Sequence, residues 1–238
     1  MARILIPGEF VCSSVYSAAT KDEKVIGVGL EKRSDGIHAT VPGVLRERDN
    51  KMWVVTSSRR YVPHAGDRIL GVVTVKAGDF YRVDIGAADL ALLSFMSFEG
   101  ATKRNRPNVR VGDLIYGQIV LSSKHFEPEL SCVDSEGRAH GMGVISTPGL
   151  VFTVALNYAR KLLSPDDNFL SLLGNRLKFE ITIGINGKVW LSGGINQTLA
   201  VRDSILEYET TFDSNKQQLV EKTVLNALSC APTPMELS

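Results

Sequence analysis

Apolar and polar residues alternate along much of the first half of the chain, in short runs separated by glycine, proline, aspartate and asparagine. Period-two alternation is typical of strands with one buried face, and those turn residues are typical of strand ends. Residues 1–62 contain only short runs of this kind and therefore predict a small β domain with a thin core. The runs lie at residues 25–30, 37–41, 44–45 and 52–55.

A short phrase occurs twice in the middle of the chain. Residues 66–73 read GDRILGVV, and residues 112–119 read GDLIYGQI. In each copy Gly-Asp is typical of a turn, the alternation that follows is typical of a strand, and the second glycine lets that strand bend round a small barrel. The repeat therefore predicts two barrel strands that begin in the same way.

The pattern around this repeat predicts a five-stranded barrel over residues 63–142. A longer irregular connection, residues 96–110, separates the third strand from the fourth. Five strands with such a link are typical of an OB-type barrel, whose second and third strands commonly form an oligonucleotide-binding face. The expected strands lie near residues 67–75, 80–85, 90–95, 111–120 and 128–133.

The second barrel strand has an inward and an outward set of side chains. Alternation directs Tyr81, Val83 and Ile85 to the core, and it directs Phe80, Arg82 and Asp84 outward. An exposed aromatic ring next to a cation could stack on the bases of single-stranded nucleic acid. Packing of Phe80 against a neighbouring domain is an equally open alternative.

The long connection carries Lys103, Arg104 and Arg106 on a loop that ends at Pro107. Cations concentrated on a loop are candidates for phosphate contacts, with Phe80 and Arg82 as a stacking surface nearby. A solvated basic loop without a ligand is the alternative, because lysine and arginine also gather on loops for solubility.

Residues 143–238 change from period two to a mixed pattern. The order strand, helix, helix, strand, strand, helix is that of a type-I KH domain. A last helix over residues 215–228 has apolar positions at helical spacing and is expected to pack back on this domain. The expected strands are 144–145, 150–154, 179–183 and 188–191, and the expected helices are 157–163, 169–174 and 196–210.

Residues 184–187 read GING and look like the G-x-x-G loop with which KH domains clamp RNA. In an RNA-binding type-I KH domain that loop joins the first two helices, whereas GING joins two expected strands, where Asn-Gly is a strong hairpin signal. Gly184, Asn186 and Gly187 are therefore predicted to form a structural turn. The true position of the clamp, residues 164–167, has no glycine and includes Asp166 and Asp167, which would repel phosphate.

Composition limits the possible functions. Twenty-seven Lys and Arg against 26 Asp and Glu give a net charge of +1, so nucleic acid would have to bind through a local patch. Three scattered cysteines without a C-x-x-C pair argue against a disulfide framework and a structural zinc, and favour a reducing, intracellular compartment. No apolar stretch approaches the ~20 residues of a membrane span, which predicts a soluble protein without a membrane partner.

The residues give little support to catalysis. The four histidines stand apart without metal-ligand spacing, and there is no P-loop or dinucleotide fingerprint. The adjacent pair Asp166-Asp167 is interpreted as a surface helix cap. We therefore expect no catalytic residue, metal or cofactor.

Several phrases together resemble a family of cap subunits of the eukaryotic RNA exosome, the ribosomal RNA-processing protein 40 family. The resemblance extends over about residues 42–210, and the phrases at 101–107 and 184–187 are its most specific parts. The phrases begin at RYVP (60–63) and include LSF (93–95), ATKRNRP (101–107), VGDLIYG (111–117) and GINGKVW (184–190).

The resemblance implies a multidomain, mainly β plus α+β chain: an N-terminal β domain, an S1-like barrel and a degenerate KH-like domain. It implies a non-catalytic subunit that sits with other cap subunits on a ring of RNase PH-like subunits and guides single-stranded RNA into the channel for 3′→5′ degradation, including the processing of ribosomal RNA. It also implies residence in nucleus and nucleolus and in cytoplasm. A free-standing single-stranded-RNA-binding regulator and an RNA-processing enzyme are the alternatives.

Overall fold

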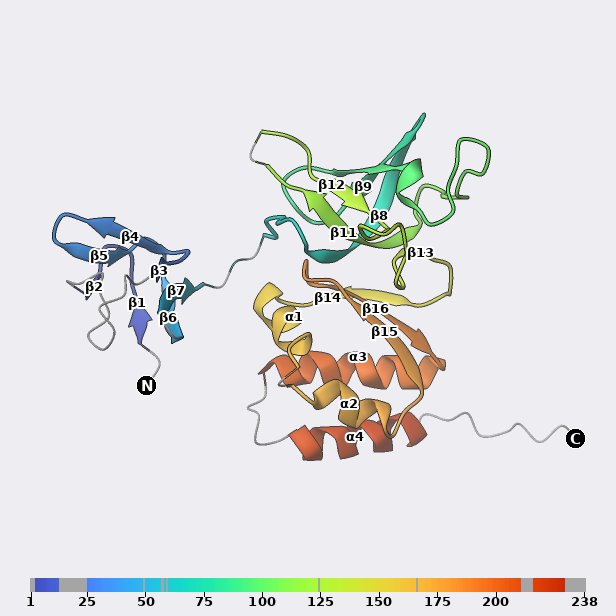
Figure 1. Ribbon diagram of the computed structural model, residues 1–238. Coiled ribbons are helices and arrows are strands. Elements are labelled where there is room, and N and C mark those ends of the chain that lie inside the picture. The colour runs from blue at the N-terminus through green and yellow to red at the C-terminus, as the bar shows by residue number, and fades with distance from the viewer. Residues whose placement is uncertain are drawn as a thin grey trace, which may run out of the picture. The chain divides into compact units, whose positions relative to one another are not determined.

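The computed structural model describes residues 3–12, 25–48, 50–56, 58, 60–123, 125–165, 167–210 and 216–229 (Figure 1). It divides the chain into two units, Met1–Ser58 and Arg59–Ser238. The second unit contains both the barrel and the helical domain. None of the helices in the described part of the chain has the length and apolar character that crossing a bilayer requires.

The described residues of the first unit form two small sheets around a thin core. One sheet has the order β1-β6-β7-β3, and the other has the order β2-β5-β4. Leu5, Ala39 and Val54 form the buried centre. The strands are β1 (Ile4–Leu5), β2 (Phe10–Cys12), β3 (Val25–Ile26), β4 (Leu30–Arg33), β5 (Gly36–Ala39), β6 (Gly43–Arg48) and β7 (Lys51–Val55).

The second unit begins with the predicted barrel. Its strands are β8 (Arg68–Ala77), β9 (Phe80–Asp84), β10 (Ala91–Ser94), β11 (Leu114–Leu121) and β12 (Glu129–Ser131). They follow the order β12-β10-β9-β8-β11, and pairing of β11 with β12 closes the barrel. Tyr81, Val83 and Ile85 are buried in its core, as the alternation predicted. The OB-like barrel is therefore confirmed.

One short strand has a different partner from the one expected. The sequence grouped residues 144–145 with the third domain, but β13 (Gly143–Ile145) pairs with β11 of the barrel. A strand of this length carries too little pattern to indicate which sheet it joins.

The two Gly-Asp turns of the repeat have the same geometry. Gly66 has a φ of +94° and Gly112 a φ of +96°, in the left-handed region that favours glycine. In the first turn the carboxylate of Asp67 accepts the backbone N–H of His64 at 3.2 Å. In the second, Asp113 accepts the N–H of Arg110 at 2.8 Å. The repeat thus starts β8 and β11, which pair with each other.

The second glycine of each copy permits close strand contact. A Cβ on Gly71 would come within 2.3 Å of the Val83 side chain, and one on Gly117 within 2.9 Å of the carbonyl oxygen of Ser131. Both positions therefore require glycine for barrel closure.

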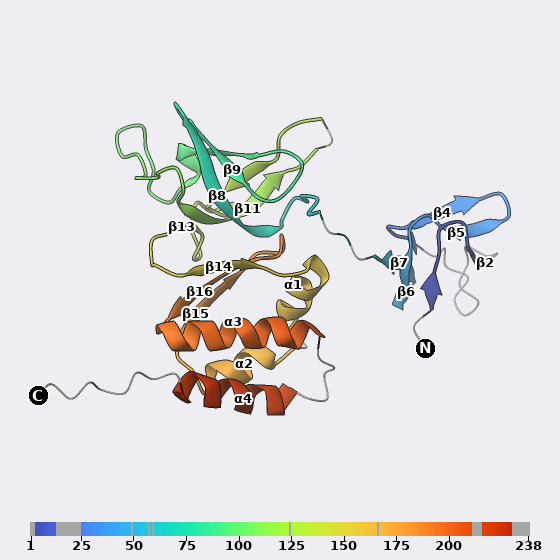
Figure 2. The same ribbon diagram turned by 180° about the vertical axis from the view of Figure 1, so that it is seen from behind.

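The rest of the second unit has the expected KH-like order. The sheet order is β14-β16-β15, and Figures 1 and 2 show α2, α3 and α4 on the side of this sheet away from the barrel. The elements are β14 (Leu150–Thr153), α1 (Leu156–Leu162), α2 (Phe169–Gly174), β15 (Phe179–Ile183), β16 (Lys188–Gly193), α3 (Ile195–Thr210) and α4 (Lys216–Ser229).

The last helix packs back on this domain, as predicted. Leu219 and Val220 of α4 belong to the same buried cluster as Phe169 of α2 and Ile205 of α3. The expected first residue of this helix, Asn215, lies outside the described residues.

The predicted surface cap at residues 166–167 is wrong in one respect. The Asp167 carboxylate does accept the Phe169 N–H at the start of α2, at 3.0 Å, but its side chain is only 5% exposed. Tyr208 of α3 donates to it at 3.0 Å and Lys216 of α4 at 3.1 Å. The helices α3 and α4, which come later in the chain, therefore cover Asp167. The sequence near Asp167 carries no sign of this contact. Asp166 lies outside the described residues.

Candidate nucleic-acid interface

The outer face of β9 presents an aromatic ring and a cation. Phe80 lies between Ala77 of β8 and Ser94 of β10 in the strand register, and the residue remains 45% exposed. Arg82 follows on the same face and is also exposed. The second unit therefore leaves the Phe80 ring open for stacking.

The basic loop has internal hydrogen bonds that shape its tip. The backbone N–H of Thr102 donates to the carbonyl oxygen of Asn105, and the N–H of Asn105 donates to the hydroxyl of Thr102, each at 3.0 Å. The Asn105 side chain also donates to the carbonyl oxygen of Gly100 at 3.3 Å. These bonds close a turn with Lys103 and Arg104 exposed at its apex.

Arg106 is held at the base of the same loop. Its guanidinium lies 3.0 Å from the Asp79 carboxylate, which belongs to the turn between β8 and β9. The guanidinium also stands over the ring of Phe95, 4.6 Å from the centroid. These contacts place the base of the loop beside the β8–β9 turn, which immediately precedes Phe80.

Arg82 also has an acidic partner. Its guanidinium lies 3.3 Å from the carboxylate of Glu127, in the connection between β11 and β12, and both side chains are almost half exposed. The structure thus places Phe80 and Arg82 on the outer face of β9 and Arg106 against the turn that precedes this strand. Arg82 and Arg106 each lie opposite a carboxylate.

Sequence reasoning missed four residues of this interface. The Thr-x-x-Asn spacing of Thr102 and Asn105 could have indicated the turn that displays the two apical cations. Asp79 and Glu127 gave no local signal, because each meets its arginine across segments distant in sequence.

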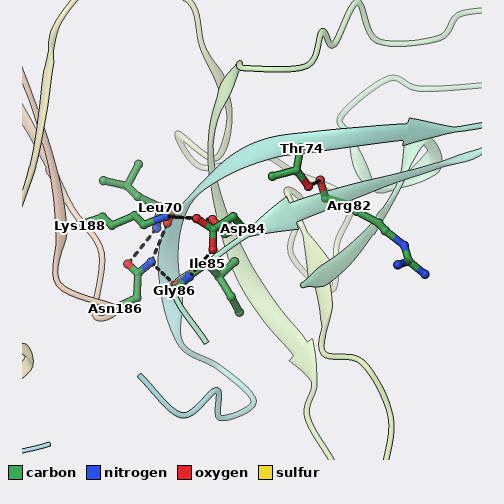
Figure 3. Close-up of polar contacts among 8 residues, drawn as sticks. All are labelled: Leu70, Thr74, Arg82, Asp84, Ile85, Gly86, Asn186 and Lys188. Atoms are coloured by element: carbon green, nitrogen blue, oxygen red, sulfur yellow. Dashed lines mark hydrogen bonds and ion pairs between the residues drawn. The ribbon is translucent and has the colours of Figure 1, made fainter. Parts of the chain in front are cut away.

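The GING segment lies elsewhere, at the junction between the KH-like domain and the barrel. It forms the turn of the β15–β16 hairpin. The side-chain amide of Asn186 donates to the carbonyl oxygens of Leu70 and Ile85 at 2.7 and 2.8 Å. Its oxygen accepts the N–H of Leu70 at 3.3 Å. Figure 3 shows Asn186 directed at the barrel and the Arg82 side chain pointing away from this junction.

Neighbouring residues reinforce the junction. The N–H of Ile185 donates to the carbonyl oxygen of Arg68 at 2.9 Å. The Lys188 ammonium lies 3.1 Å from the carboxylate of Asp84. Burial would raise the pKa of Asp84, but hydrogen bonds from the Gly86 N–H and from Lys188 more than offset this and lower the pKa. Asp84, placed by alternation on the outer face with Arg82, is therefore a junction residue.

The glycines of this turn are required by its surroundings. Gly187 has a φ of +79°, and a Cβ there would lie 2.5 Å from the carbonyl oxygen of Val154. A Cβ on Gly184 would lie 2.7 Å from the backbone nitrogen of Leu70. A turn this close to the barrel leaves no room for a phosphate backbone.

The described residues contain no cluster of three or more His, Cys, Asp or Glu side chains arranged to hold a metal ion. The candidate site consists of the exposed ring of Phe80 and the cations Arg82, Lys103, Arg104 and Arg106.

Comparison with known proteins gives the same two domains. A family model described as "Exosome complex component RRP40, S1 domain" matches residues 61–143, and a KH-domain model matches residues 149–197. A solved structure titled "Crystal structure of putative exosome complex RNA-binding protein" superposes with a TM-score of 0.58 at 21% identity, over 72% of this chain and 99% of the other. That likeness supports the fold alone.

Curated relatives extend the similarity over most of the chain. The human exosome complex component RRP40 is 44% identical over 209 residues, which are 84% of this chain and 76% of the human protein. The Drosophila melanogaster protein of the same name is 40% identical, over 87% of this chain and 89% of its own length. At this identity and coverage, the chain belongs to the RRP40 family of exosome complex components.

Proposed function

We propose that this chain is a non-catalytic subunit of an RNA exosome that contacts single-stranded RNA through its barrel. Family membership supports the complex, since the relatives are named as exosome components. The observation that carries the RNA contact is the turn with Lys103 and Arg104 at its apex, on a loop that Arg106 ties to the turn before Phe80. The Phe80 residue is exposed on the outer face of an OB-like barrel.

The chemistry of this surface suits weak binding without sequence preference. One aromatic platform contributes about 1–3 kcal/mol per stacked base, and the exposed cations add phosphate contacts that salt screens. Such a surface can guide RNA that other subunits also hold. RNA bound at one subunit has a high effective concentration at the next, so several weak contacts together hold the strand. A free-standing regulator would need tighter binding than one short basic turn provides.

The remaining parts of the proposal concern partners and place. We expect contacts with RNase PH-like ring subunits and with other cap subunits, and residence in nucleus, nucleolus and cytoplasm. Crosslinking mass spectrometry of the purified complex would test the partners. Imaging of a tagged chain expressed at its natural level would test the location.

The experiment that tests the function compares the chain in its complex with the chain alone. The protein is purified from its own cells at low salt, its assemblies are weighed by native mass spectrometry, and each fraction is assayed for 3′→5′ decay of a labelled RNA. We expect recovery with several other subunits, and decay only in those fractions. A lone chain that binds RNA tightly would favour the regulator, and decay by the purified single chain would show that it is an enzyme.

A further inference from the structure

Two of the arginines on the candidate RNA surface are partly neutralised by carboxylates from other segments. Asp79 in the β8–β9 turn lies 3.0 Å from Arg106, and Glu127 in the β11–β12 connection lies 3.3 Å from Arg82. All four side chains are between 43% and 59% exposed. Because both arginines are exposed, neither needs a carboxylate to compensate for a buried charge. The packing of the core therefore does not explain the two ion pairs.

The apical cations differ from these arginines. Lys103 and Arg104 form no ion pair with a described residue and point into solvent at the tip of the turn. A phosphate can approach them directly. At Arg82 and Arg106, a phosphate must either displace the carboxylate or share the guanidinium with it. Sharing is unfavourable, because phosphate and carboxylate are both negatively charged.

Such a displacement has a small cost. An exposed ion pair is weak, because water and salt screen it, so a phosphate can compete with the carboxylate. The carboxylate then stays near the site and repels the incoming phosphate at close range. The surface is therefore weaker for RNA than the number of its cations suggests.

We propose that Asp79 and Glu127 lower the affinity of this barrel surface for single-stranded RNA, so that a strand is held loosely enough to slide along it. This inference rests on the proposed function, because it assigns a role to carboxylates at the proposed RNA-contact surface. A path for a moving polymer gains from contacts that break easily, and each carboxylate replaces the phosphate as soon as the phosphate leaves.

The structure makes the two carboxylates suitable for neutral substitution. Arg106 would remain over the Phe95 ring without Asp79. The backbone carbonyl of Asp79, which accepts the Phe95 N–H at 3.1 Å, is unchanged in Asp79→Asn. Arg82 is held on its strand by β-pairing and by the Thr74 hydroxyl, which donates to its carbonyl oxygen at 3.0 Å. Glu127→Gln therefore leaves the position of the arginine backbone intact.

The control must change the same charge on the same barrel. Asp89 is exposed and lies between β9 and β10, at the end of β9 opposite Asp79. Asp89→Asn alters the net charge of the chain by the same amount as Asp79→Asn, and it leaves both ion pairs in place.

The test measures the binding of a fluorescein-labelled single-stranded oligouridine to the full chain by anisotropy, over a salt series, with the melting temperature of every variant checked. We expect Asp79→Asn and Glu127→Gln each to tighten binding about 2–5-fold at low salt. This factor corresponds to the free energy of one exposed ion pair. Asp89→Asn should change it much less. The gain from Glu127→Gln should disappear when Arg82→Ala is added.

Each outcome has one meaning. Equal effects of all three neutral variants would show only a net-charge effect and would overturn the inference, and so would weaker binding of Asp79→Asn at an unchanged melting temperature. The proposed RNA surface is tested separately with Lys103→Ala/Arg104→Ala. If that variant binds as the wild type does, the surface itself is wrong; if it binds weakly while the carboxylate variants match the control, only the inference fails.

Discussion

The side-chain amide nitrogen of Asn186 lies 2.7 Å from the backbone carbonyl oxygen of Leu70, 116 positions earlier in the chain. The same nitrogen reaches the carbonyl oxygen of Ile85 at 2.8 Å. A segment that resembles an RNA clamp is thus used inside the protein, to fix the KH-like domain on the barrel. The Arg82 side chain points away from this junction (Figure 3). Phe80 and Arg82 on the outer face of β9 and the basic loop stay the candidate surface for RNA.

Removing the Asn186 amide should destabilise the second unit. Asn186→Ala leaves the two carbonyl oxygens and the N–H of Leu70 without their side-chain partner, in a site where Asn186 is only 8% exposed. We expect a loss of about 3 kcal/mol in the free energy of unfolding measured with urea. Asn175→Ala, at an exposed position, is the control. Equal losses for the two variants would contradict the role of Asn186.

Gly187 should tolerate no side chain, for two separable reasons. Gly187 and Gly137 share a φ of +79°, but a Cβ on Gly137 would meet nothing within 4 Å, whereas one on Gly187 would lie 2.5 Å from the carbonyl oxygen of Val154. Gly137→Ala therefore measures the backbone strain, about 1–2 kcal/mol. Gly187→Ala should cost clearly more in the same urea experiment. Similar costs would show that the contact with Val154 relaxes freely.

The free energy of unfolding should fall at low pH, because Asp167 becomes protonated there. Burial would raise the pKa of this carboxyl, but hydrogen bonds from Phe169, Lys216 and Tyr208 outweigh burial and lower the pKa. Because the folded pKa lies below the unfolded value of about 3.9, Asp167 stabilises the fold above that value, and the contribution is lost as the pH falls through the folded pKa.

Urea unfolding between pH 6 and pH 2.5 measures this dependence. Asp167→Asn should be less stable than the wild type at pH 6, and the difference should shrink below about pH 4. Asp203→Asn, with a side chain that is 62% exposed, should follow the wild-type curve. A difference between Asp167→Asn and the wild type that stays constant with pH would contradict the assignment.

Cys132 should be unreactive in the folded protein. Its side chain is 1% exposed, and burial raises the pKa of the thiol to about 12, so at pH 8 almost no thiolate forms. Iodoacetamide labelling followed by peptide mass spectrometry should modify Cys12, which is less buried, well before Cys132. Denaturation should equalise the two rates. Equal rates in the native protein would show that this part of the barrel core opens readily.

Turn signals and period-two alternation correctly predicted the elements that depend on residues close together in the sequence. The Gly-Asp repeat indicated two turns, and their φ angles differ by only a few degrees. Alternation correctly placed Tyr81, Val83 and Ile85 in the core and Phe80 and Arg82 outside it. Asn-Gly indicated a hairpin where β15 and β16 pair.

Contacts between distant segments could not be predicted in this way. The barrel partner of β13, the cover over Asp167 and the carboxylates opposite Arg82 and Arg106 all depend on tertiary packing. The RNA-contact roles of Phe80, Arg82, Lys103, Arg104 and Arg106 stay predictions. The structure adds that Phe80, Lys103 and Arg104 are exposed. It also shows that Arg82 and Arg106 are each ion-paired with a carboxylate.

The most direct test of the RNA path is ultraviolet crosslinking of single-stranded RNA to the assembled complex, with the crosslinked residues of this chain mapped by mass spectrometry. We expect crosslinks in residues 79–82 and 102–106, and their loss in a complex carrying Lys103→Ala/Arg104→Ala. Crosslinks confined to the Gly184–Gly187 turn, or unchanged by that variant, would contradict the account.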